Sequence, residues 1–113
     1  YVVKALGEQA ARRYFITAER FSAEHGQALG FVHECVAPDL LDAKVAEFVQ
    51  MLVHNGPMAV QACKRLVQDI AGRPITPDLR EDTARRIADI RVSEEGRAGI
   101  RSFLEKTAPP WLG

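Results

Sequence analysis

The sequence has no excess of charge of either sign, no long apolar run and only two cysteines. Fifteen Lys and Arg residues balance fifteen Asp and Glu residues, so no overall field favours nucleic acid or an anionic membrane. No apolar run approaches the roughly 20 residues that span a bilayer, and Tyr1 opens without a charged leader. Cys35 and Cys63 lack metal-site spacing, which favours reduced, buried thiols over a disulfide. These absences predict a soluble, cytoplasmic protein that binds neither nucleic acid nor membrane.

The familiar catalytic and metal-binding motifs are missing as well. The sequence contains no GxSxG or HExxH motif, no glycine-rich phosphate loop and no carboxylate cluster with metal-ligand spacing. His25, His33 and His54 are scattered along the chain, and no acidic residue at a set spacing orients any of them. His33 and Glu34 are neighbours in an expected strand and would point to opposite faces. We therefore predict no catalytic residue, no metal and no cofactor in this chain, and we interpret the histidines as structural or solvated.

What the sequence does contain is helical periodicity over most of its length. Apolar residues recur at three- and four-residue steps between capping residues, prolines and glycines. Glycine ends helices readily and costs about 1 kcal/mol relative to alanine inside one, which predicts a break at Gly7. Helix starts are predicted at Ser22, Asp39, Pro57, Thr76 and Ser93.

Two segments interrupt this succession of helices. Residues 31–36, Phe-Val-His-Glu-Cys-Val, alternate and are rich in β-branched and aromatic residues, which predicts a short strand or extended segment. Asn55-Gly56-Pro57 separates two helical segments and predicts an antiparallel helix hairpin with a tight joint. The expected fold class is mainly α, a single helical region over residues 1–113 with one short extended strand near residues 31–36.

Two kinds of surface feature are candidates for ligand binding. Basic doublets such as Arg12-Arg13 lie on helices whose other face is apolar, which favours solvated faces over phosphate sites. Phe103 and Lys106 are three residues apart on the last helix and should share a face, with an apolar ring beside a cation. Such a pair suits an anionic ligand that has a flat or apolar part. The spacing alone favours a core aromatic residue beside a surface lysine.

Several of these segments together resemble the carboxyl-terminal region of the enoyl-CoA hydratase/isomerase (crotonase) family. Thr17-Ala-Glu-Arg-Phe21 resembles the family's Thr-Gly-Glu signature, and the run to Gly30-Phe-Val32 resembles its Ala-x-x-x-Gly-Leu-Val segment. Asn55-Gly56-Pro57 resembles its Gly/Ser-Pro helix joint. Residues 93–106 resemble its closing Ser-x-Asp-x-x-Glu-Gly-x-x-Ala-Phe-x-Glu-Lys segment. The resemblance covers essentially the whole chain.

The resemblance implies a fold, a reaction and a set of partners. Residues 1–36 would form the end of the core and a linking strand, and residues 37–113 the assembly helices that cover the active site. These helices would also pack subunits into trimers or hexamers. The parent protein would add water reversibly to the double bond of an enoyl-CoA thioester without a metal, and an isomerase or another crotonase-fold acyl-CoA enzyme is the near alternative.

The resemblance also implies where the chemistry lies. The two N–H groups that hold the thioester oxygen and the catalytic glutamates would precede Tyr1, so this chain alone should be inactive, because losing one such donor typically costs about 10²–10³ in rate. Phe103 and Lys106 would contact the adenine-phosphate end of CoA or the acyl tunnel. Ala98 and Thr107 depart from the family pattern near that end. A stand-alone helical interaction module is the alternative from a different class.

Overall fold

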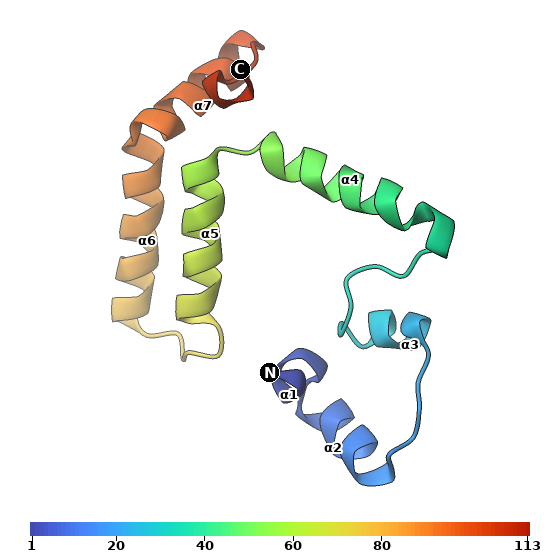
Figure 1. Cartoon of the computed structure of the whole chain (residues 1–113). Helices are drawn as coiled ribbons and strands as arrows, with labels where there is room; N and C mark the ends of the chain where they lie inside the picture. Colours follow the sequence, from blue (N-terminus) through green and yellow to red (C-terminus); the bar gives the residue numbers. More distant parts are fainter. The chain divides into compact units, whose positions relative to one another are not determined.

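The computed structural model describes all residues, 1–113, and every regular element in it is a helix (Figure 1). The mainly helical prediction is confirmed. The chain divides into two compact units, Tyr1–Lys44 and Val45–Gly113. The elements are α1 Val2–Leu6, α2 Glu8–Thr17, α3 Ala23–Ala28, the 3-10 turn η1 Pro38–Leu40, α4 Leu41–Val53, α5 Pro57–Ile70, α6 Pro77–Val92, α7 Glu94–Glu105 and the 3-10 turn η2 Pro110–Leu112.

The first unit forms around an aromatic cluster. Gly7 separates α1 from α2 with φ 78°, a conformation that glycine adopts without strain. The Ser22 hydroxyl accepts the His25 N–H at 3.2 Å and caps α3 as predicted. The Tyr14 ring lies 4.6 Å from the Phe21 ring between centroids, and the Tyr14 hydroxyl lies 2.7 Å from His25 Nε2. These contacts join α2 to α3 within one short stretch of chain.

The short strand predicted at residues 31–36 is absent. Phe31 to His33 form a bend, and the residues after them up to η1 have no regular structure. The amide N–H groups of Phe31 and Val32 bond back to the Gly26 carbonyl at 2.8 and 3.4 Å. A strand needs a neighbouring strand for its backbone bonds, and here the end of α3 accepts them instead.

The second unit is built on α5, α6 and α7. Helices α5 and α6 lie side by side and antiparallel, and α7 packs against both (Figure 1). The Thr76 hydroxyl caps α6 by accepting the Leu79 N–H at 3.2 Å, and the Ser93 hydroxyl caps α7 by accepting the Gly96 N–H at 3.0 Å. Both helix starts were predicted at these hydroxyls, because Ser and Thr satisfy amides that have no partner inside the helix.

Two sequence-based predictions about α4 are wrong. The antiparallel neighbours are α5 and α6, and α4 makes no comparable contact with α5. Gly56, with φ −60° and ψ 125°, contributes one extended residue before Pro57, which turns a corner but does not reverse the chain. Asp39 does not cap the helix either, because Pro38 starts the 3-10 turn η1 and no side chain caps it.

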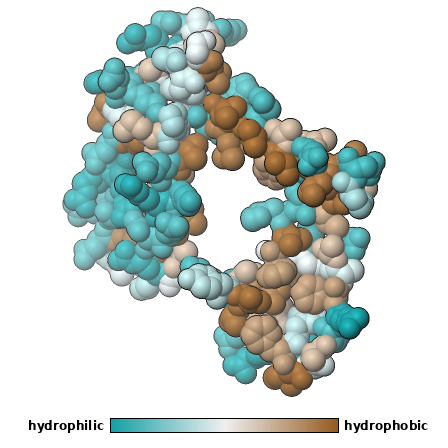
Figure 2. Space-filling model, in the orientation of Figure 1, coloured by the Kyte–Doolittle hydropathy of each residue, from teal (hydrophilic) through white to brown (hydrophobic).

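Most of the large apolar side chains are exposed. Figure 2 shows brown apolar surface over α4 and over α1 to α3, whereas α6 is mostly teal. The exposed apolar side chains of α4 are Leu41, Val45, Phe48, Val49, Met51, Leu52 and Val53. Monomeric proteins rarely expose apolar surface so continuously.

Two further properties bear on the expectations from sequence. None of the helices combines the length and the apolar character needed to cross a membrane. Cys35 and Cys63 are free thiols, Cys35 half-buried and Cys63 exposed. The expectation of buried thiols is therefore wrong, because Cys63 lines the open groove between α5 and α6 and stays exposed there.

Candidate functional site

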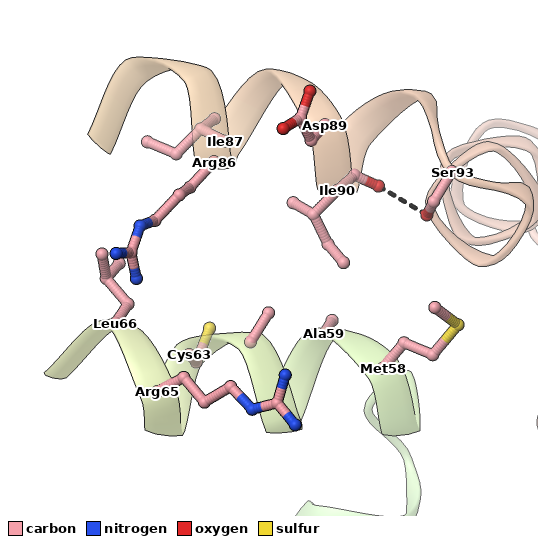
Figure 3. Close-up of a pocket in the computed structure, with 11 residues that line it drawn as sticks. Met58, Ala59, Cys63, Arg65, Leu66, Arg86, Ile87, Asp89, Ile90 and Ser93 are labelled. Atoms are coloured by element: carbon pink, nitrogen blue, oxygen red, sulfur yellow. Dashed lines mark hydrogen bonds between the residues drawn. The ribbon is translucent and has the colours of Figure 1, made fainter. Parts of the chain in front are cut away.

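A pocket of about 510 Å³ lies between α5 and α6 in the second unit (Figure 3). Its apolar lining consists of Met58, Ala59, Ala62, Leu66, Ile87 and Ile90. The polar side chains at its edge are Arg65, Arg86, Asp89 and Ser93. The pocket is therefore an apolar groove with a polar rim.

Two of the rim side chains are engaged in holding the unit together. Arg86 pairs with Asp69 on α5 and with Asp82 one turn earlier on α6, the latter at 2.9 Å. The hydrogen bond to Asp69 raises the pKa of Arg86 above its ordinary value. Ser93 donates its hydroxyl hydrogen to the Ile90 carbonyl at 2.7 Å while it caps α7. This arrangement ties α5, α6 and the start of α7 together but provides no acid and base aimed at a common point.

The predicted ligand-binding pair lies at the end of α7. Phe103 is 83% exposed, an unusual degree for an aromatic ring on a well-formed helix. Helix α7 ends at Glu105, and Lys106 occupies its C-cap in the left-handed conformation with φ 55°. The two side chains are therefore not related by regular helical spacing, contrary to the shared face that the sequence suggested. Both residues are exposed at the carboxyl-terminal end of α7.

A carboxylate from α7 caps the start of α5. The N-cap of α5 is Gly56, which has no side chain, and the first helical residue is Pro57, which has no N–H. Glu95 supplies the missing acceptors, because its two carboxylate oxygens accept the N–H groups of Met58 at 3.0 Å and Ala59 at 2.9 Å. A negative charge is favoured at a helix N-terminus. This contact joins the beginning of α7 to the beginning of α5.

The tail after α7 folds back onto the same helix. Trp111 donates its indole N–H to the His54 carbonyl at 3.2 Å, just after the end of α4. Its ring lies so close to α7 that a Cβ added at Gly99 would be 3.0 Å from the Trp111 Cη2 atom. Gly99 thus leaves room for the indole, and the tail connects α7 to the α4–α5 joint.

The histidines serve local structure. His25 bonds Tyr14 within the aromatic cluster, and the His54 Nδ1 atom lies 2.7 Å from the Gln50 carbonyl on its own helix. No group of three or more His, Cys, Asp or Glu side chains gathers in a way that could hold a metal ion. Phe103 and Lys106 lie apart from these groups, exposed at the end of α7.

Comparison with known proteins decides the family. A model of the enoyl-CoA hydratase/isomerase family matches residues 1–113, the whole chain. The chain belongs to the enoyl-CoA hydratase/isomerase family. Among curated relatives, the 2,3-dehydroadipyl-CoA hydratase of Escherichia coli strain K12 is 22% identical over 113 residues, which cover 99% of this chain and 44% of that protein. The family resemblance inferred from the sequence is confirmed.

Solved structures agree with this assignment. An enoyl-CoA hydratase from Shewanella pealeana superposes with a TM-score of 0.90 and 40% identity over 98% of this chain and 41% of its own. An enoyl-CoA hydratase of Mycobacterium smegmatis superposes with a TM-score of 0.87 and 28% identity over 97% of this chain and 42% of its own. The chain thus spans less than half the length of the relatives it matches.

Sequence reasoning found the family but missed the two contacts that fix α7 in this member of it. These contacts are made by Glu95 at the start of α7 and by Trp111 in the tail. One sequence signal pointed to the first contact: Gly56-Pro57 starts a helix with neither a capping side chain nor a first N–H, so a distant acceptor was needed. No comparable signal marks Trp111.

Proposed function

We propose that this chain is the carboxyl-terminal part of an enoyl-CoA hydratase that adds water reversibly to the double bond of an enoyl-CoA thioester. The observation that carries the proposal is the match of the whole chain to solved enoyl-CoA hydratases, at 40% identity over 98% of its length in one case. In this proposal the missing part of the enzyme activates the water and stabilises the thioester oxygen. The present segment covers the active site and binds the nucleotide end of the substrate.

Phe103 and Lys106 are proposed to hold the adenine-phosphate end of CoA. An exposed aromatic ring gains about 25 cal/mol for each square ångström of apolar surface that a ligand covers, and Phe103 has most of its surface available. A lysine ammonium binds phosphate as a point charge, and Lys106 forms no ion pair with a carboxylate of the chain. An exposed flat ring and a cation at the same end of one helix match a nucleobase that carries phosphates.

The reaction is tested with two substrates on the full-length protein. A hydratase consumes a 2-enoyl-CoA, so the absorbance of the conjugated thioester falls. An isomerase instead converts a 3-enoyl-CoA to the conjugated isomer, and the absorbance rises. Loss of signal from the first substrate with no gain from the second supports the hydratase. The reverse result would assign the isomerase, and no change with either would favour a non-catalytic interaction module.

Assembly is the second part of the proposal. The apolar residues of α4 have no partner surface within the chain that buries them, and burying such a helix face requires further protein. We expect the full-length protein to form trimers or hexamers through this helical region. Light scattering of the full-length protein checks this, and a monomer at high concentration would contradict it.

A further inference from the structure

The beginning of helix α7 is held by a hydrogen bond between residues that are far apart in the sequence. Glu95 lies in the first turn of α7, and its carboxylate spans the N-terminus of α5, 37 residues earlier at Met58. Gly56 makes room for this carboxylate, since a Cβ at Gly56 would collide with the Glu95 side chain. One side chain of α7 thus ties the first turn of this helix to the first turn of α5.

The other end of α7 is fixed through the tail. The chain leaves the helix at Lys106 in the left-handed conformation, which costs a non-glycine residue energy and persists only where the surroundings impose it. The Thr107 N–H closes this turn on the Ser102 carbonyl at 3.0 Å. Trp111 then secures the tail against Gly99 and the His54 carbonyl. The backbone of Lys106 is thus held between α7 and an anchored tail.

We propose that Glu95 and Trp111 are positioning residues that aim the exposed end of α7, with Phe103 and Lys106, at the nucleotide end of CoA. This inference rests on the proposed function. Glu95 ties the first turn of α7 to the start of α5, and roughly 16 Å further along the helix Trp111 holds the tail that follows Lys106. Neither residue touches the substrate. Both act through the direction and the cap of one helix.

The test compares two thioesters on the full-length enzyme. Enoyl-CoA carries the adenosine phosphates, whereas the enoyl thioester of pantetheine has the same reacting group without them. Trp111→Ala and Glu95→Ala are expected to raise KM for enoyl-CoA roughly tenfold, because Phe103 and Lys106 would no longer be held where they bind the nucleotide end of the substrate. Values of kcat/KM for the pantetheine thioester should stay unchanged. A general structural defect would lower both.

Matched control variants distinguish the loss of these two contacts from a general loss of helix stability. Glu94→Ala removes the neighbouring first-turn carboxylate, which makes no bond to the amides of α5, and should leave both substrates unaffected. Trp111→Phe keeps a ring against Gly99 but loses the bond to His54, so it should show a smaller rise in KM for enoyl-CoA. Glu95→Gln keeps an acceptor and should behave likewise. If Trp111→Ala fails to fold, these two conservative variants decide the question.

The possible outcomes separate this inference from the function on which it rests. A wild-type enzyme that acts on neither thioester would overturn the proposed function and, with it, the positioning roles. An active wild type whose Glu95 and Trp111 variants lose equal activity on both thioesters, or lose none, would overturn only the positioning roles. A rise in KM confined to enoyl-CoA supports them.

Discussion

The contacts inside the two units join residues that lie at very different separations in the sequence. In Tyr1–Lys44 the central contact joins Tyr14 to His25, 11 residues apart. In Val45–Gly113 the bonds that fix α7 span 37 residues from Met58 to Glu95 and 57 residues from His54 to Trp111. Closing a longer loop costs more chain entropy, so the bonds of Glu95 and Trp111 constrain more of the chain than the Tyr14–His25 contact does. Substitutions in the two units should therefore differ in how much stability they remove and in how far from the substituted residue their effects extend.

The largest effect is expected from Trp111→Ala. The substitution removes an indole that packs on Gly99 and bonds His54, and it should lower the free energy of unfolding by about 2 kcal/mol, less than for a fully buried tryptophan. Urea denaturation followed by circular dichroism measures this. Leu112→Ala is the neighbouring control. A loss no greater than that of the control would mean that the tail does not anchor α7.

The next largest effect is expected from Glu95→Ala. Two amides at the start of α5 lose their acceptor, which should cost about 1–2 kcal/mol, as the loss of a helix cap does. Amide hydrogen exchange should speed up at Met58 and Ala59 in particular. Glu94→Ala should leave both amides protected. Unchanged protection of Met58 and Ala59 in the Glu95 variant would show that this long-range contact does not stabilise the second unit.

A smaller and local effect is expected in the first unit. Tyr14→Phe removes one hydrogen bond to His25 and leaves the ring against Phe21, so the cost should be about 1 kcal/mol. Hydrogen exchange should rise in α2 and α3 and stay the same in α5 to α7. If exchange rose equally in both units, the distinction between a local and a long-range unit would fail.

The smallest expected effect is on the pKa of Glu19 in the first unit. Arg13 donates hydrogen bonds to the Glu19 carboxylate, one of them from Nη2 to Oε2 at 2.9 Å, and these lower the pKa of Glu19 below its ordinary value. A lowered folded-state pKa gives stability that is present above the unfolded value and is lost as pH falls through the folded value. Arg13→Ala should bring the pKa of Glu19 back up toward the ordinary value in an NMR titration. Because the pair is exposed, overall stability should hardly change.

The sequence predicted the local features of both units well and the long-range ones poorly. Gly7, Ser22, Thr76 and Ser93 act where expected, because a glycine break or a hydroxyl cap depends only on residues within one turn. Residues 31–36 have strand-like composition but no strand partner. Composition cannot show whether a partner exists, so the strand was predicted and is absent.

The helix joint and the candidate site illustrate the same limit. Asn55-Gly56-Pro57 correctly marks where one helix ends and the next begins, but the angle between the two helices follows from the backbone dihedrals of Gly56, which the residue types do not fix. Phe103 and Lys106 could be selected from the sequence because of the family resemblance. Their shared helix face was not realised, because the helix stops one residue before Lys106.

The central claim is that the exposed end of α7 holds the nucleotide end of CoA, and Lys106→Gly tests it most directly. Glycine removes the ammonium group but suits the left-handed backbone at this cap, so any loss of binding cannot come from a destabilised helix. Titration of the full-length protein with CoA should give a Kd about fivefold higher for the variant, together with an equal or higher melting temperature. An unchanged Kd for CoA would contradict the account.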